Sequence, residues 1–177
     1  MVEVIVVIII LMIVMAMAIV QVRALLPAMR ANAAMHMVVG QMRTAREMAI
    51  AQRRSVQVVF TPPNQIRLTR VNQPVGVTNL PAVFFEGGAQ FVVFQGVPDT
   101  PAGFGNSAPI VFGGMTGGPP NMQFQSNGTF ADGLGQPING SIFAGIPGQP
   151  ATARAVTILG ATGRVRPYRW TGSVWAQ

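Results

Sequence analysis

The feature that most constrains this chain is an uninterrupted apolar run close to its start. From Val4 to Val20 the sequence reads VIVVIIILMIVMAMAIV, which is seventeen residues without a charge, a glycine or a proline. A helix of this length measures about 25 Å, which just reaches across the hydrocarbon core of a bilayer. A soluble β-rich domain would interrupt such a run with turns. We therefore expect a helix that enters a membrane or packs against other apolar helices.

The charges beside the run do not fit a simple secretion signal or a simple anchor. A cleaved signal peptide normally has a positive segment before a shorter apolar stretch, whereas here the preceding charged residue is Glu3. The first arginine is Arg23, and Arg30 follows it. By the positive-inside rule these arginines favour the orientation opposite to that of a secreted C-terminal domain. The pattern argues against an ordinary single-span anchor that inserts on its own.

The helical pattern continues well beyond the apolar run. Ala, Met, Gln and Arg, which are good helix formers, dominate the stretch between Pro27 and Arg54. The sequence therefore predicts one helix of about fifty residues over 1–54, with a membrane or filament half at 1–22 and a distal half at 23–54. Pro27 removes a backbone donor and predicts a kink.

The distal half of the predicted helix has an apolar stripe and a basic side. Four apolar residues recur at intervals of three or four positions, so a sheet can cover them: Val38, Met42, Ala45 and Ala49. Four arginines cluster on the opposite side: Arg43, Arg46, Arg53 and Arg54. Val39 and Ile50 also lie on that side, where a lone subunit would leave them in contact with water. We expect Val39 and Ile50 to contact neighbouring copies.

After Arg54 the sequence becomes β-rich. Alternation at Ser55 to Phe60 and at Gln65 to Val71, with a proline-containing stop between them, predicts a strand, a turn and a second strand. Asn127-Gly128 and Asn139-Gly140 are typical of hairpin turns. The Gly-rich and Pro-rich stretch from Gly96 to Pro120 predicts a long surface loop. Further strands are expected at Ala82 to Phe85, Gln90 to Phe94, Pro109 to Phe112, Met122 to Gln125, Ser141 to Phe143, Ala155 to Leu159 and Val165 to Tyr168. The predicted fold class is α+β, with the long helix packed on a small antiparallel sheet in a head at 55–177.

Composition excludes several classes of function. Half of the residues are apolar and 10% are charged, which is too apolar for a disordered chain. The chain has no cysteine, one histidine and five scattered acids, so we expect no catalytic, metal or cofactor site and no enzymatic activity. All twelve basic residues are arginine and the net charge is +7, which favours anionic partners without specifying one.

Three segments resemble the type IV pilin superfamily. The start, MVEVIVVIIILMIVMAMAIV, is similar to the mature N-terminus of these proteins, in which a Glu precedes an apolar helix. The segments QMRTAREMAIAQRRSVQVVF and TGRVRPYRW are similar to the H-type pseudopilin and FimT-like branch. The family Glu is the fifth mature residue, whereas Glu3 is the third residue here. The Gly-Phe processing junction of the family is absent.

The resemblance implies a structural subunit that polymerises through its apolar helix into an extracellular pilus-like filament, or a pseudopilin of a type II secretion system. The precursor would reside in the bacterial inner membrane, and the product would be an extracellular filament or a periplasmic pseudopilus. Its partners would be copies of itself and other pilins. A buried carboxylate is costly unless it is paired, so Glu3 would pair with the N-terminal amine of an adjacent subunit. The alternative is that Glu3 simply lies at the membrane interface.

The C-terminal part carries a second signal. Arg164, Arg166 and Arg169 alternate with the rings of Tyr168 and Trp170, which is typical of a groove that holds phosphates and bases. FimT-like minor pilins are implicated in DNA uptake through a Gly-Arg-x-Arg motif, which Arg164 and Arg166 match. The alternative function is therefore a minor pilin that binds DNA. A terminal strand whose arginines face water or a neighbouring subunit explains the same pattern.

Overall fold

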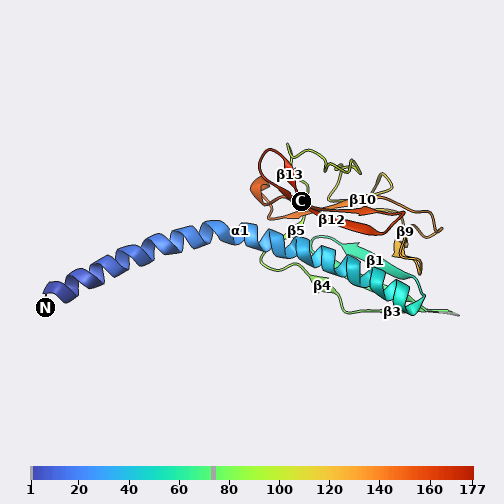
Figure 1. Cartoon of the computed structure of the whole chain (residues 1–177), viewed down its shortest axis with the longest axis horizontal. Coiled ribbons are helices and arrows are strands. Elements are labelled where there is room, and N and C mark those ends of the chain that lie inside the picture. The colour runs from blue at the N-terminus through green and yellow to red at the C-terminus, as the bar shows by residue number, and fades with distance from the viewer. Residues whose placement is uncertain (1, 73–74) are drawn as a thin grey trace.

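The computed structural model contains one long helix followed by a β-rich head (Figure 1). It describes residues 2–72 and 75–177, and of residues 16–24 it describes the helical backbone alone. Helix α1 runs over Val2–Gln52 with Pro27 in its interior, as the sequence predicts, and it is bowed along its length (Figure 1). The helix ends where Arg53 adopts a positive φ of 49° and the amide of Arg54 donates to the carbonyl of Ala49.

The strands of the described chain form two antiparallel sheets. The first sheet has the order β3-β2-β1-β8-β9, with β4 also on β2, and the second has the order β13-β12-β11-β10-β6-β7, with β5 also on β10. The strands of the first sheet are β1 (Val56–Thr61), β2 (Gln65–Val71), β3 (Val77–Asn79), β4 (Val83–Phe84), β8 (Gln123–Phe124) and β9 (Phe130–Ala131). Those of the second are β5 (Gln90–Phe91), β6 (Ile110–Phe112), β7 (Met115–Thr116), β10 (Gly140–Gly145), β11 (Arg154–Leu159), β12 (Arg164–Trp170) and β13 (Trp175–Ala176). A short 3-10 turn, Pro150–Thr152, precedes β11.

Alternation along the strands decides which side chains enter the core. In the β1–β2 hairpin, Val58 lies opposite Leu68, and both side chains are buried. In the second sheet, Ile142 lies opposite Val156, and both belong to the same core cluster as the helix residues. Period-two patterns therefore place one apolar face of each sheet against α1.

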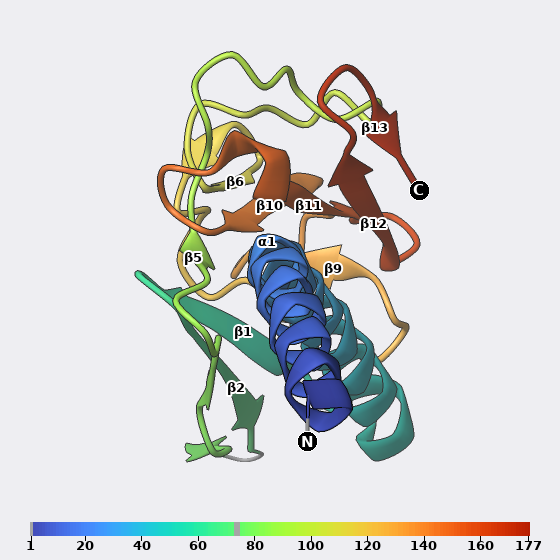
Figure 2. The ribbon, with the colours of Figure 1, turned by 90° about the vertical axis from the view of Figure 1, so that its left-hand side faces the viewer.

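The distal half of α1 lies between the two sheets, which Figure 2 shows in a view along the helix. The predicted stripe of Val38, Met42, Ala45 and Ala49 is fully buried, as expected. The prediction that Val39 is exposed is wrong, because only 6% of this residue is accessible and it belongs to the core cluster. The prediction assumed one small sheet, whereas two sheets bury a wider arc of the helix. Ile50 is 44% exposed.

The two predicted hairpin turns have different outcomes. Asn127-Gly128 joins β8 to β9, as predicted, with Gly128 at a positive φ of 83°. The prediction of a hairpin turn at Asn139-Gly140 is wrong. Gly140 opens strand β10 directly, and the Asn139 side chain instead accepts a hydrogen bond of 2.9 Å from the amide of Gly160. A glycine is needed at 140 because the Phe112 ring occupies the space of a Cβ.

The head should fold without the proximal half of the helix. Among the described side chains of α1, the first buried one is Ala31, so removal of residues 1–24 leaves the described core intact. We expect the shortened chain to be soluble and monomeric in size-exclusion chromatography, with the circular dichroism of a helix and a sheet. A shortened chain that is unfolded, or that still polymerises, would contradict this division.

Gly160 should be intolerant of any side chain. A Cβ at this position would overlap the backbone of Ile138, which cannot move as a flexible side chain can. We expect Gly160→Ala to lower the free energy of unfolding by about 1–3 kcal/mol. Gly40→Ala is the matched control, since nothing lies within 4 Å of its Cβ position, and alanine should stabilise the helix by about 0.5–1 kcal/mol. Urea denaturation of the shortened chain measures both, and equal effects would contradict the packing described.

Candidate functional site

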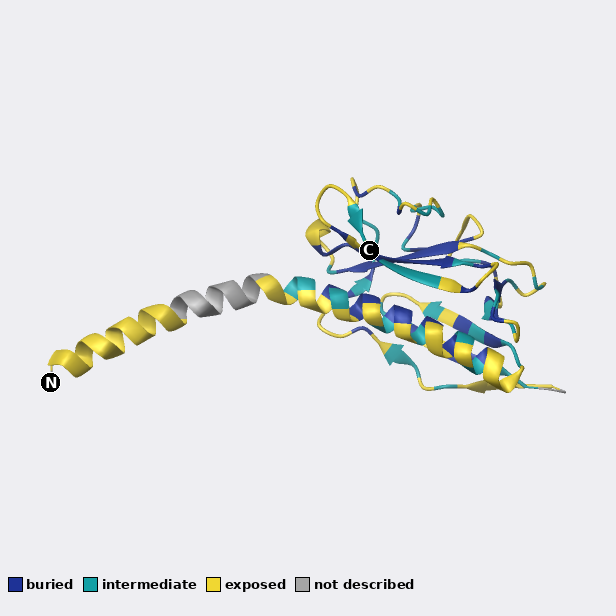
Figure 3. Cartoon of the chain, viewed as in Figure 1, coloured by how far each residue is buried: buried dark blue, intermediate teal, exposed yellow. Residues whose placement is uncertain are grey.

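The proximal half of α1 presents apolar side chains to solvent. Every described side chain from residue 2 to residue 15 is exposed, and Glu3 is the charged residue among them (Figure 3). Monomeric soluble proteins seldom expose a continuous apolar surface of this extent. This surface extends away from the head and has no covering element in the described chain (Figure 3).

The predicted membrane run falls partly outside the described side chains. The run ends at Val20, and the side chains of residues 16–20 are among those outside the description. Over the residues whose side chains the structure describes, no helix is long and apolar enough to cross a membrane. Glu3 lies in the first turn of α1, where a negative charge interacts favourably with the helix dipole.

The C-terminal cluster does not form one groove. Successive side chains of β12 point to opposite faces of the sheet, so Arg164 and Arg166 share one face and Arg169 lies on the other. The rings are not available for stacking on bases, because Tyr168 is 2% exposed and Trp170 is 9% exposed. Both rings pack in small clusters that include Trp175. The expectation of open rings beside the arginines is therefore wrong, while DNA binding by the arginines alone stays a prediction.

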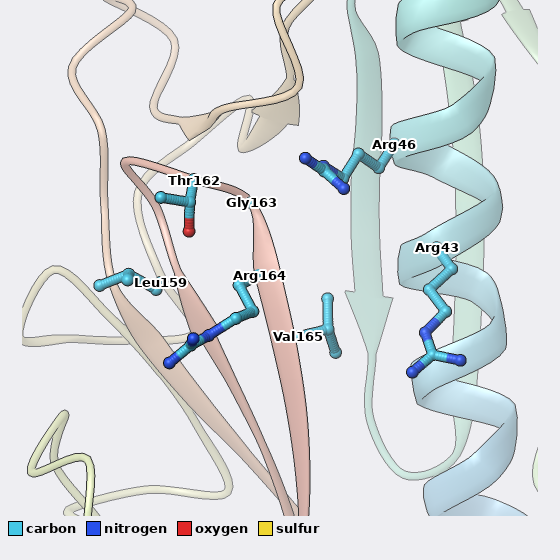
Figure 4. A pocket seen from close by; sticks show the side chains of 7 residues that line it. All are labelled: Arg43, Arg46, Leu159, Thr162, Gly163, Arg164 and Val165. Atoms are coloured by element: carbon cyan, nitrogen blue, oxygen red, sulfur yellow. The ribbon is translucent and has the colours of Figure 1, made fainter.

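The structure instead brings helix arginines to the start of β12. A hollow of about 500 Å³ lies between α1 and the β11–β12 hairpin, and Val165 lies beside it (Figure 4). Arg43 and Arg46 extend into it from α1, and the Arg46 Nε donates a 3.1 Å hydrogen bond to the carbonyl of Gly128. Gly163 permits this approach, because a Cβ there would overlap the Gly128 carbonyl. No Asp or Glu of the described part of the chain lines the hollow.

A second hollow of about 260 Å³ lies on the outer face of the same sheet. Arg164 and Arg166 line it together with the side chains of Thr157, Tyr168 and Gln177, and loop residues of the 101–104 segment form its apolar wall. No acid lines this hollow either. Arg164 borders both hollows, so the four arginines at positions 43, 46, 164 and 166 form one basic band across the start of β12.

The structure contains a buried arginine that was not predicted from the sequence. Arg154 is 3% exposed, and its Nε donates a 2.6 Å hydrogen bond to Oδ1 of Asn32 on α1. Its Nη1 donates to the carbonyls of Ala151 and Ala153. Burial, and then the neighbouring charge of Arg169, lower the pKa of Arg154. The alternation of side chains along β11 could have indicated this burial, since Arg154 points to the same face of the strand as the core residues Val156 and Ile158.

The described side chains offer no metal centre. No group of three or more His, Cys, Asp or Glu residues lies close enough together to hold an ion in the described parts of the chain. The structure presents two unlike surfaces, an apolar one on the proximal half of α1 and a basic one on the head.

Comparison with known proteins gives the fold. No family model matches the chain, and no curated protein matches it significantly. Among solved structures, the minor pseudopilin EpsH from the type 2 secretion system of Vibrio cholerae matches 78% of this chain and 95% of its own, with a TM-score of 0.50 and 15% identity. The chain has a pseudopilin fold. A second structure of EpsH covers 81% of this chain and 96% of its own at 16% identity and a TM-score of 0.49.

The pseudopilin fold agrees with the fold class that the sequence predicts. Its long N-terminal helix and small β domain confirm the expected α+β class. At 15% identity the likeness concerns the fold and not the surfaces.

Arg154 should be needed to hold α1 on the second sheet of this pseudopilin fold. Arg154→Met keeps an aliphatic stem but leaves Asn32 and the Ala153 carbonyl without their donor. We expect the free energy of unfolding to fall by about 2–4 kcal/mol in urea denaturation. Arg169→Gln is the control, because it removes an exposed neighbouring charge and no hydrogen bond to Asn32. Equal loss in both variants would contradict the role given to Arg154.

Proposed function

We propose that this protein is a structural, non-enzymatic subunit of a pilin-like fibre, assembled through the proximal half of α1. The observation that carries the proposal is the division of one continuous helix. Its distal half forms the core of the head, while the described apolar side chains of residues 2–15 have no partner within the described chain. When copies pack together, the apolar side chains of such a helix leave water, and this burial stabilises the assembly.

Of the possible fibres, the pseudopilus of a type II secretion system is the one that the fold likeness to EpsH supports. In that setting the subunit would be held in the bacterial inner membrane before assembly and would then extend into the periplasm. Its partners would be copies of itself or other pseudopilins. An extracellular pilus-like filament uses the same apolar helix and is the second candidate.

Glu3 is the proposed assembly residue within the apolar surface. A carboxylate enclosed by apolar helices is costly unless a cation accompanies it, and the amine at the start of a neighbouring mature chain can supply one. Ile50 is a further candidate for contacts between copies, because it is exposed at the distal end of α1. Val39 is not proposed to contact neighbouring copies, because it lies in the core.

DNA capture remains the alternative function, with less support. The basic band supplies charges for phosphates, but Tyr168 and Trp170 do not offer free ring faces to bases. Binding through the arginines alone would be independent of base sequence and strongly dependent on salt.

Glu3→Gln and Glu3→Ala should impair assembly and leave membrane association intact. Insertion depends on the apolar run, which both substitutions preserve, whereas assembly loses a buried ion pair. We expect the yield of sheared fibres to fall by about tenfold or more, since removing one partner of a buried pair costs about 3–5 kcal/mol.

The matched control is Glu47→Gln, which removes an exposed carboxylate from the distal half of the same helix. Carbonate extraction measures membrane association for all variants. Normal fibre yield from both Glu3 variants would remove the assembly role of this residue, while the apolar surface could still be tested by truncation.

A further inference from the structure

The first half of β12 is an open sheet edge. Strand β13 pairs with β12 only at Arg169 and Trp170, so no described strand lies beside residues 164–168 on the side away from β11. The amide of Trp170 donates to the carbonyl of Ala153, which precedes β11, so the main-chain groups of residues 164, 166, 168 and 170 point toward β11. Those of Val165 and Pro167 therefore point outward.

This edge is equipped to accept another strand. The outward groups are the N–H and C=O of Val165 and the C=O of Pro167, and Pro167 has no N–H to leave unsatisfied. An extended segment laid along the edge would exchange hydrogen bonds with these groups, as in peptide recognition by strand addition. Its side chains would alternate between the two hollows that flank β12.

The positive charge of both hollows indicates that the added segment carries acidic side chains. One alternate set of side chains would face Arg43 and Arg46, and the other would face Arg164 and Arg166. Neither hollow is lined by an acid among the described residues, so no described carboxylate lies beside the arginines there. An incoming segment with carboxylates would gain charge-assisted hydrogen bonds on either face.

We propose that the open edge of β12 binds an acid-rich extended segment of a different protein by strand addition, with the four arginines of the basic band pairing its carboxylates. A second copy of this chain does not supply such a segment. Its five acids, Glu3, Glu47, Glu86, Asp99 and Asp132, lie at least thirteen positions apart in sequence, so no strand-length segment carries two of them.

A peptide fits these observations better than a nucleic acid does. The outward main-chain groups form a ladder that a peptide can complete, whereas a nucleic-acid strand would leave this ladder unused and would contact the arginines through its phosphates alone. The nearest rings, Tyr168 and Trp170, are buried. The proposal is independent of fibre assembly, because the proximal half of α1 takes no part in it.

The test uses the full chain in a non-ionic detergent and a short fluorescein-labelled peptide in which Glu and Val alternate. A peptide of alternating Lys and Val and a single-stranded oligodeoxynucleotide are the comparison probes. We expect the Glu peptide to bind and the Lys peptide not to bind. Val165→Pro removes the outward N–H and should weaken peptide binding by about tenfold or more. Val165→Ala loses side-chain packing but keeps the N–H, so it should bind as the unmodified chain does.

A second pair of variants tests the charges. Arg164→Gln with Arg166→Gln should weaken binding of the Glu peptide severalfold and reduce its dependence on salt. Arg53→Gln with Arg67→Gln, which removes two exposed arginines elsewhere, should not. Slower hydrogen exchange at the Val165 amide on adding the peptide to the unmodified chain would support strand addition even if Val165→Pro fails to fold.

Three results would overturn the proposal. The first is no binding of the Glu peptide, which would leave the arginines and Pro167 as protection of a sheet edge against aggregation. The second is peptide binding with unchanged exchange at Val165. The third is binding of the oligonucleotide without the peptide, lost in the Arg164 and Arg166 variant, which would assign the basic band to nucleic acid.

Discussion

The burial of one helix between two sheets is the interaction on which the rest of this structure depends. The distal half of α1 supplies Val38, Met42, Ala45 and Ala49 to a core that both sheets share. The two sheets also contact each other directly, as Phe60 of β1 stacks on Phe112 of β6, and the helix completes the core that they share. The same packing places the start of β12 beside Arg43 and Arg46, because α1 packs directly on β11 and β12.

The same helix also explains why the chain has two unlike surfaces. Its proximal half continues the distal half without a break but has no sheet over it, so apolar side chains remain exposed. Its distal half carries Arg43 and Arg46, which line one hollow together with Arg164 at the start of β12. We therefore propose that assembly and partner recognition occur at opposite ends of one helix. A change at Glu3 should leave the basic band unaffected for this reason.

Much of the fold could be predicted from the sequence because its signals are local. The spacing of the buried stripe from Val38 to Ala49, the β1–β2 hairpin and the turn at Gly128 each depend on a few adjacent residues. Val39 was misplaced because its burial depends on the second sheet, which closes on the helix from far along the chain. The hairpin expected at Gly140 failed because the Phe112 ring and the Asn139 amide determine the local conformation there.

The candidate site was harder to predict, because its residues come together only in the folded chain. Arg164 and Arg166 were recognised as a basic pair, but Arg43 and Arg46 come from a helix more than a hundred residues earlier. Tyr168 and Trp170 looked like stacking platforms because their burial depends on Trp175 and on residues of the 93–97 segment. Arg154 lies on the same face of β11 as core residues, but its contact with Asn32 could not be predicted because this hydrogen-bond partner is 122 positions away in the sequence.

The central claim is that the apolar half of α1 exists to pack against copies of itself or related helices. Electron cryomicroscopy of the assembled fibre tests this most directly. The account predicts a map in which residues 2–15 of adjacent subunits pack helix against helix along the fibre axis, with the heads outside. A fibre held together by the heads alone, with the apolar helices separated from one another, would contradict it.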